Sequence, residues 1–187
     1  MIEVLKSTEN KSDLITKTTA YNWLPVELST NDNPCNSSGR VNWEIKSDKV
    51  SAPVAYAILN SRITYWLWRL WSDGFHLTNQ FVYNLPYGHD FFGKIDKQRA
   101  EELGLNLWNN IQRELIVSKN AGMISHSYCP LKFSALLDEI DNLLIATYGL
   151  PDSTSEYLKK NISQLIIAGR ENEIKTITKM KYLESIN

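Results

Sequence analysis

The stretch LNSRITYWLWRLWSDGFHLTNQFVYNLPYG, residues 59–88, decides the fold because the periodicity of the chain changes there. From Pro53 onwards apolar residues recur at intervals of three and four, which is the spacing of one helix face. This spacing predicts a helix over 53–72 that ends at Asp73-Gly74. Trp68 points away from the apolar stripe, so we expect the helix to pack between two layers. The stripe comprises Ala55, Ile58, Leu59, Ile63, Trp66, Leu67 and Leu70.

A membrane-spanning role for this helix is excluded by its length and charge. Its uncharged run, 63–68, is six residues long and is bounded by Arg62 and Arg69. A spanning helix needs about 20 apolar residues. We therefore expect no membrane partner.

The composition is that of an ordinary globular chain. Its 187 residues are 43% hydrophobic and 22% charged, which suits a single domain spanning 1–187. The net charge of −1 argues against a free-standing, non-specific nucleic-acid binder, because such proteins are usually basic. Cys35 and Cys129 are too few for a disulfide framework, and the first residues lack a signal peptide's apolar core. These features predict a cytoplasmic setting.

The first 50 residues predict a strand–loop–strand element. Polar turn formers fill 29–40, and short β-like runs at 19–28 and 40–47 flank them. In the second run Val41, Trp43 and Ile45 alternate with polar residues. A further short strand is expected within 76–87. The fold class predicted is α+β, with a small N-terminal β element packed on a predominantly helical body.

The rest of the chain is predicted to be helical. Asp96 is a plausible N-cap for a helix reaching about Lys119. A second helix covers 134–149 and ends at Gly149. Ser153 and Glu156 have the spacing of a capping box, which opens a helix to Gly169, and a last helix covers about 171–184.

Asn84-Leu85-Pro86-Tyr87 matches the loop with which amino-methyltransferases hold a flipped adenine. Such enzymes also need a Gly-rich turn for S-adenosylmethionine, and the eight glycines of this chain never fall as Gly-x-Gly. The interpretation we favour is a structural turn.

Two groups of charged residues raise the possibility of a metal site. Glu44 and Lys46 have the Glu-x-Lys spacing of Mg²⁺-dependent nucleases, with Asp32 as an earlier acid. The solvent face of an amphipathic strand explains the same spacing and is the favoured interpretation. Asp138, Glu139 and Asp141 are likewise expected to form a solvated acidic face.

Arg62 and Arg69 stand two helical turns apart, about 10 Å, on the border of the predicted helix. Two guanidinium groups at this spacing could reach two phosphates of a nucleic acid. Alternatively, their stems cover apolar surface while their heads meet water or acidic residues.

The chain resembles the region that follows the catalytic domain in adenine-specific DNA methyltransferases of restriction–modification systems, including the type IIG enzymes. In that region an aromatic helix beginning LNS is followed by a polar loop and a strand that ends in NLP. The matching residues are Leu59-Asn60-Ser61, Ser72-Asp73-Gly74, His76-Leu77-Thr78 and Asn84-Leu85-Pro86. The stretch 136–160 is similar to the closing IDxLVAxLYGLTxxE helix pair, through Ile140-Asp141, Ala146, Tyr148-Gly149-Leu150 and Glu156.

The resemblance covers roughly 54–160 and implies a target-recognition module that binds double-stranded DNA. It implies a separate methyltransferase catalytic domain or subunit, which would carry S-adenosylmethionine and, if a nuclease accompanies it, Mg²⁺. No cofactor is expected in this chain. The candidate base and backbone contacts are Arg40, Asn42, Lys46, His76, Thr78, Asn79 and Gln80, with Arg62 and Arg69 on phosphates.

Two other functions are compatible with the sequence. One is a protein-interaction subunit of a phage-defence complex, in which the aromatic helix forms a subunit interface. The other is a small Mg²⁺-dependent nuclease that uses Glu44 and Lys46.

Overall fold

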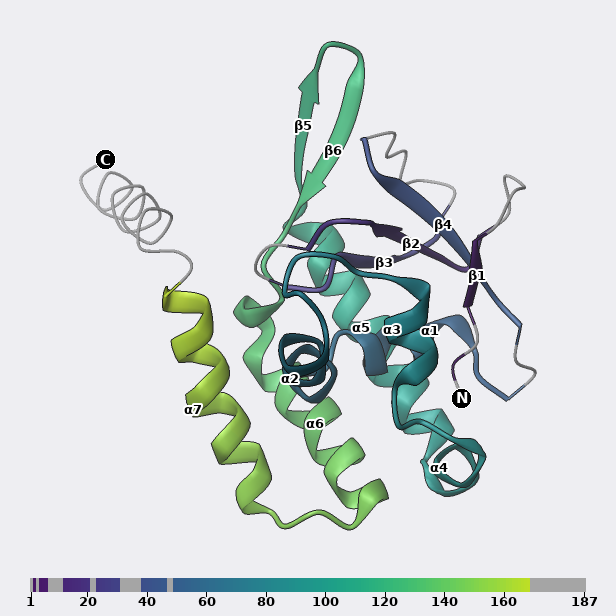
Figure 1. Ribbon diagram of the computed structural model, residues 1–187, viewed down its shortest axis with the longest axis vertical. Helices are drawn as coiled ribbons and strands as arrows, with labels where there is room; N and C mark the ends of the chain where they lie inside the picture. The colour runs from purple at the N-terminus through teal and green to yellow at the C-terminus, as the bar shows by residue number, and fades with distance from the viewer. Residues whose placement is uncertain are drawn as a thin grey trace.

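The computed structural model describes residues 2, 4–6, 12–20, 23–30, 38–46 and 49–168. The fold is α+β, with a small antiparallel sheet at the N-terminus and a helical body, as the sequence predicts. In Figure 1 the sheet lies above the helices, and a separate hairpin projects from the top of the molecule. The expected helix at 171–184 lies outside the described residues.

The N-terminal sheet has the strand order β1-β4-β2-β3, with every neighbouring pair antiparallel. Its central strand β4 carries Trp43, which is 1% exposed, on the face that packs against the helices. Val41 and Ile45 lie against the same core, as their alternation predicts. The strands are β1 (Val4–Lys6), β2 (Leu14–Lys17), β3 (Val26–Leu28) and β4 (Arg40–Ile45).

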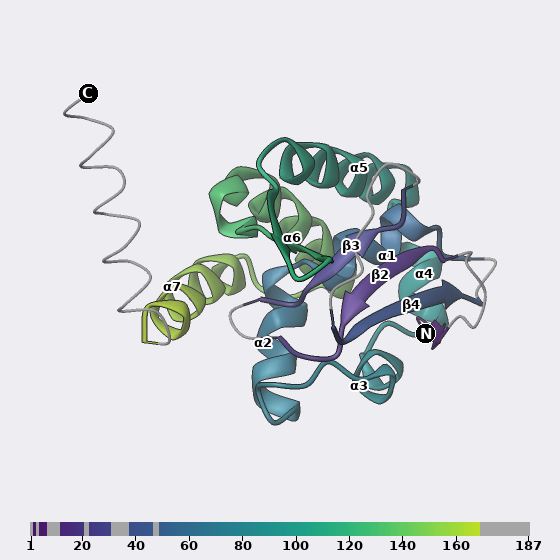
Figure 2. The same ribbon diagram turned by 90° about the horizontal axis from the view of Figure 1, so that it is seen from above.

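The helical body surrounds one buried helix, α1, which packs against α5 and β3. Gly104 of α5 makes this contact possible, because a Cβ there would stand 2.2 Å from the carbonyl oxygen of Pro53. Figure 2, seen from above, shows the sheet strands in front of the helices, with α5 and α6 toward the top of the view and α2 and α3 toward the bottom. The helices are α1 (Ala52–Leu59), α2 (Arg62–Trp71), α3 (Asn79–Asn84), α4 (His89–Lys94), α5 (Lys97–Arg113), η1 (Pro130–Phe133), α6 (Ser134–Tyr148) and α7 (Ser153–Ala168).

The single helix predicted over 53–72 is wrong, because the chain breaks between α1 and α2. The side chain of Asn60 donates to the carbonyl of Tyr56 at 3.1 Å. Ser61 then caps α2 by accepting from the backbone N–H of Thr64 at 3.1 Å. The two polar residues therefore close one helix and open the next.

This break changes which side of α2 meets the core. Trp68, on the side opposite the predicted stripe, is fully buried, which agrees with the expected packing on both sides, whereas Leu70, predicted to lie on the stripe, is 58% exposed. Trp68 also donates from its indole nitrogen to the carbonyl of His76 at 2.9 Å. The apolar stripe was assigned on the assumption of one continuous helix. Because α1 and α2 are separate helices, the face of α2 that was predicted to be buried differs from the face that is buried.

The strand expected within 76–87 is also wrong, because residues Asn79–Asn84 form the short helix α3. Thr78 caps it by accepting from the N–H of Phe81 at 3.2 Å. The β-like part of this segment is one isolated antiparallel bridge between His76 and Thr19.

The helix predicted from Asp96 begins as expected, since the Asp96 carboxylate accepts from the N–H of Arg99 at 2.9 Å. It ends at Arg113 instead of Lys119. The chain then forms a two-stranded hairpin, β5 (Ile116–Asn120) and β6 (Met123–Ser127), which the sequence analysis missed. Downstream, Gly149 ends α6 in the left-handed conformation, as predicted.

Candidate functional site

Segment 17–20, at the end of β2, joins loops that are far apart in the sequence. The N–H of Thr18 donates to the carbonyl of Gly39 at 3.0 Å. The carbonyl of Thr18 accepts from the N–H of Leu77 at 3.0 Å, and the N–H of Ala20 donates to Phe75 at 2.8 Å. The loop before β4 and the loop after α2 are therefore held on the same short segment.

We call the polar side chains around this segment the junction surface, and define it as Lys17, Thr18, Arg40, His76 and Thr78. Arg40 stands opposite Lys17 in the β2–β4 ladder, and His76 bridges to Thr19, two residues further on. Three of the predicted contact residues thus come together, although the sequence separates them into two groups.

The loop after α2 is shaped by one carboxylate. Asp73 accepts from the backbone N–H groups of Phe75 at 2.9 Å and His76 at 2.7 Å, and from Nδ1 of the His76 ring. The side-chain and backbone hydrogen bonds from His76, followed by the one from Phe75, lower the pKa of Asp73 to about 2. Since Nδ1 is used in this bond, Nε2 is the ring nitrogen of His76 that a ligand would meet.

A hollow of about 460 Å³ lies between the end of α2, this loop and α3. Trp71 is 56% exposed on its wall, beside His76, Thr78 and Gln80. The amide of Gln80 donates to the side chain of Asn84 at 3.2 Å. An aromatic face beside amide groups is a combination suited to a nucleobase. The loop hollow is lined by Trp71, Ser72, Asp73, His76, Thr78, Gln80, Phe81 and Asn84. The remaining predicted contact of this loop, Asn79, is half-buried at the first position of α3 and does not line the hollow.

Arg69 is exposed near the end of α2, where its guanidinium carbon lies 5.9 Å from the centre of the Trp68 ring. It also lies across Gly74, whose φ is 70°; a Cβ there would come within 3.1 Å of a guanidinium nitrogen. Arg69 is therefore held over the loop with its charged head accessible, as a phosphate contact requires.

The contacts predicted on β4 divide along the strand. Arg40 and Asn42 alternate with core residues and lie on the sheet face away from the helices. Lys46 follows the other end of β4, about 20 Å from Arg40 at the usual rise per residue. It pairs with Glu44 at 2.7 Å. Lys46 therefore lies outside the junction surface.

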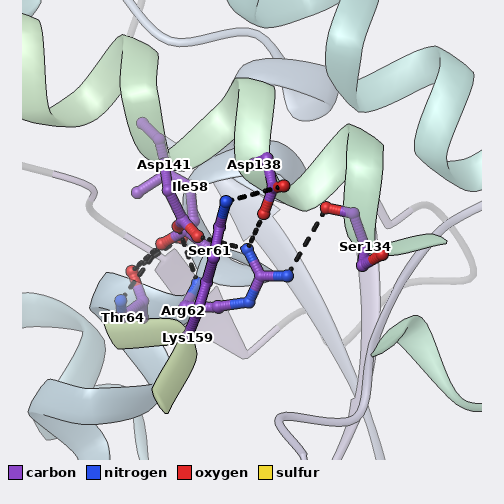
Figure 3. A network of polar contacts seen from close by, with 8 residues as sticks. All are labelled: Ile58, Ser61, Arg62, Thr64, Ser134, Asp138, Asp141 and Lys159. Atoms are coloured by element: carbon purple, nitrogen blue, oxygen red, sulfur yellow. Dashed lines mark hydrogen bonds and ion pairs between the residues drawn. The ribbon is translucent and has the colours of Figure 1, made fainter. Parts of the chain in front are cut away.

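Arg62, predicted to contact a phosphate, is buried instead. It is 4% exposed, and one guanidinium nitrogen donates to Asp138 at 2.7 Å and to Asp141 at 2.9 Å (Figure 3). Its backbone N–H donates to the other oxygen of Asp141 at 2.9 Å. The prediction for Arg62 is wrong because its charge is satisfied inside the protein.

The same network corrects the solvated acidic face predicted for α6. Asp141 is 1% exposed, whereas Asp138 is partly exposed and also pairs with Lys159 of α7 at 2.8 Å. Burial raises the pKa of Asp141 to about 6, although charge and hydrogen bonds from Arg62 oppose this. For Asp138, burial acts in the same upward direction, but Lys159 and Arg62 outweigh it and lower the pKa.

Asn84-Leu85-Pro86-Tyr87 forms a structural turn after α3, as favoured from the sequence. Tyr87 is fully buried, and its hydroxyl lies 2.8 Å from that of Thr64. The carbonyl of Pro86 accepts from the hydroxyl of Tyr148 at 2.7 Å. Tyr87 therefore has no face available for stacking on a base.

The described residues contain no group of three or more His, Cys, Asp or Glu side chains arranged to hold a metal ion. Asp32, the earlier acid of the nuclease interpretation, lies outside them. None of the described helices is both long enough and apolar enough to cross a bilayer.

Three features at or beside the site were not predicted from the sequence: Lys17, Trp71 and the β5–β6 hairpin, in which the carbonyl of His126 accepts from Lys17 at 3.4 Å. Lys17 lies in β2, where no strand was predicted, since the first predicted run, 19–28, holds β3 instead. Trp71 was assigned to a continuous helix. The hairpin had one local signal, Asn120-Ala121-Gly122, which is typical of a tight turn.

Comparisons of the chain with protein-family models, with curated proteins and with solved structures find no significant match.

Proposed function

We propose that this chain is the DNA-recognition module of a restriction–modification adenine DNA methyltransferase. It would act in the cytoplasm with a catalytic domain or subunit that carries S-adenosylmethionine. The observation that carries the proposal is the junction surface, where two loops singled out for DNA contact meet on segment 17–20.

The chemistry of this surface, taken together with the adjoining loop hollow and Arg69 beside it, suits duplex DNA. Lys17, Arg40 and Arg69 supply cationic groups of the kind that contact phosphates. Thr78 and Gln80 supply the hydroxyl and amide that bond to base edges. A low net charge is compatible with such a role if the catalytic partner contributes part of the positive field.

The polar network of Figure 3 supports the resemblance on which the proposal rests. Arg62 follows the LNS motif directly, and Asp141 is the acidic residue of the ID motif. Their side chains pair inside the protein, so the two motifs form one structural unit although 79 residues separate them. A rigid unit of this kind would hold the contact loops in a fixed relation to the catalytic partner.

Adenine methylation would take place on that partner. No Gly-x-Gly turn occurs anywhere in the sequence, and Tyr87 of the adenine-loop match is buried. The target base would therefore be flipped out of the duplex into the other domain.

Binding of the purified chain to a randomised duplex pool, at low and moderate salt, tests this proposal. We expect the retained DNA to be enriched in a short motif. Weak, salt-sensitive binding without a motif would mean that specificity requires the catalytic partner. Absence of binding even at low salt would contradict the proposal.

A protein-interaction role is the second candidate, and one observation favours it. Large apolar side chains are exposed on the end of α2, the following loop and α3: Leu70 at 58%, Trp71 at 56%, Phe75 at 38% and Tyr83 at 48%. Exposed apolar groups near one another often mark a protein interface. Self-association of the chain that disappears in Trp71→Ser, with no DNA binding at low salt, would favour this function.

A further inference from the structure

The hairpin β5–β6 projects from the body at the top of Figure 1. Its strands pair over five residues each, from Ile116 opposite Ser127 to Asn120 opposite Met123. Ala121 and Gly122 close it with φ values of 48° and 80°, the backbone of a tight two-residue turn. At about 3.4 Å per residue, the ribbon is about 17 Å long.

The two faces of the ribbon differ in chemistry. Directly paired residues point to the same face, so Ser118 lies beside Ser125, with Ser127 and Asn120 along the same face. This face therefore carries three hydroxyls and an amide, with the exposed apolar side chains of Ile116 and Met123 at its two ends. The other face carries Val117 beside His126 and Lys119 beside Ile124.

The base of the ribbon is held on the sheet by buried polar contacts. His126 is 6% exposed, and its Nδ1 lies 3.2 Å from the carboxylate of Glu27 on β3. The hydroxyl of Tyr128 donates to the carbonyl of Val26 at 2.9 Å. Because His126 faces the sheet, the hydroxyl-rich face of the ribbon is turned away from it.

The ribbon is continuous with the junction surface. Lys17 donates from its ammonium group to the carbonyl of His126 at 3.4 Å. Lys17 is also paired in register with Arg40. A ligand that lies along the junction surface therefore meets the base of the ribbon.

The charge of this part of the chain fits a polyanion. No Asp or Glu occurs between Glu114 and Asp138, and Lys119 lies within this stretch. The second lysine of the stretch, Lys132, pairs with Glu114 at 2.7 Å. Every residue of β5 is exposed, including Lys119 near the tip. Carboxylates lie instead in the body, for example on α6.

We propose that the β5–β6 ribbon enters the major groove of duplex DNA, with Ser118, Asn120 and Ser125 on base edges and Lys119 on a phosphate. This inference rests on the proposed function and names the reading element within it. A major groove about 12 Å wide admits a two-stranded ribbon, whose strands lie about 4.8 Å apart. Serine and asparagine side chains donate and accept at base edges, and the exposed Met123, which lies on the same face, can meet a thymine methyl group.

The test uses three variants of the whole chain. In the first, Asn-Gly replaces Lys119–Ile124, so that the pair Ser118–Ser125 closes a shorter hairpin in the same register. The second combines Ser118→Ala, Asn120→Ala and Ser125→Ala. The third is Lys119→Ala. Circular dichroism and thermal unfolding serve as controls, and each variant should retain the fold because the altered part of the ribbon lies outside the core.

We expect the triple variant to keep its non-specific affinity within about twofold and to lose about tenfold in preference for the selected motif. Lys119→Ala should weaken binding to all sequences and lower the salt slope by about one. Replacing guanine by 7-deazaguanine, or thymine by uracil, in the motif should reduce the affinity of the wild-type chain and of Lys119→Ala, and the effect of 7-deazaguanine should disappear in the triple variant. Both changes alter the major groove and leave the minor groove intact.

If the wild-type chain binds duplex DNA without selecting a motif, the affinity of the variant with the shorter ribbon tests the proposal. A loss of affinity of about fivefold or more, together with competition by methyl green and not by netropsin, supports the proposal. An unchanged motif in the triple variant, or unchanged affinity of the shorter ribbon, overturns it while leaving the proposed function intact. Failure of the wild-type chain to bind any duplex overturns both.

Discussion

The guanidinium of Arg62 and the carboxylate of Asp141 pair at 2.9 Å in a position where both are almost fully excluded from solvent. A second carboxylate, that of Asp138, accepts from the same guanidinium nitrogen at 2.7 Å. The pairing joins α2 to α6 and, through Lys159, to α7. Arg62, which the sequence suggested as a phosphate contact, therefore helps to hold α2, α6 and α7 together.

Arg62→Met should lower the free energy of unfolding at pH 7 by about 3 kcal/mol, because a buried carboxylate would lose its cationic partner. Denaturant titration measures this change. Arg99→Met is the matched control, since Arg99 pairs with Glu102 and Glu139 on the exposed surface. Its effect should stay within about 1 kcal/mol. Equal losses in the two variants would contradict the burial of the Arg62 charge.

Asp141 should make the protein less stable as the pH rises. Its pKa of about 6 lies above the ordinary 3.8, so the folded chain binds an extra proton between these values. The resulting stabilisation is complete below pH 4 and is lost as the pH passes 6, by about 3 kcal/mol. The wild type minus Asp141→Asn difference in unfolding free energy should therefore decrease over this range.

Asp138→Asn provides a control of opposite sign. The pKa of Asp138 is lowered, so its contribution is present above the ordinary value and is lost as the pH falls. The wild type minus Asp138→Asn difference should therefore increase as the pH rises towards the ordinary pKa of 3.8 and then level off. If the two wild type minus variant differences changed with pH in the same direction, the Arg62 network would not shift the pKa values of Asp138 and Asp141 in opposite directions.

Gly104→Ala should destabilise the protein by about 2 kcal/mol or more. The added Cβ would stand 2.2 Å from the carbonyl oxygen of Pro53, so α1 and α5 would have to separate. Gly93→Ala in α4 is the matched control, because a Cβ there meets nothing within 4 Å. Its free energy of unfolding should stay unchanged or rise by up to about 1 kcal/mol.

Tyr87→Phe should reduce stability by about 1 kcal/mol and leave DNA affinity unchanged. The change removes the hydroxyl that lies 2.8 Å from Thr64 Oγ1, while Thr64 keeps its bond to the carbonyl of Ile58. Tyr83→Phe, on the exposed side of α3, is the control and should not change stability. A folded Tyr87→Phe protein with tenfold weaker DNA binding would mean that the ring takes part in recognition.

Arg69→Ala should lower affinity evenly across DNA sequences and reduce the salt slope by about one, because Arg69 is expected to contact a phosphate. Arg99→Ala removes the same charge from a residue already paired with two carboxylates, and should leave both quantities unchanged. An unchanged salt slope in Arg69→Ala would remove Arg69 from the interface.

The sequence predicts those parts of the fold that depend on neighbouring residues. The Asp96 cap, the left-handed Gly149 and the alternation around Trp43 are all found as expected. Each of these signals acts within a few residues, so it can be recognised without knowledge of the rest of the chain. The polar residues of the candidate contact loops can also be recognised directly from the sequence.

The break at Asn60-Ser61 is made by local hydrogen bonds, whereas only the tertiary structure decides which face of α2 is buried and whether Arg62 meets solvent. Each depends on groups distant in the sequence, such as Asp141 beside Arg62. The junction surface has the same origin, since backbone bonds to Thr18 bring Gly39 and Leu77 together. Periodicity and capping reach over a few residues, whereas the pairing of charges and strands is settled when the core is packed.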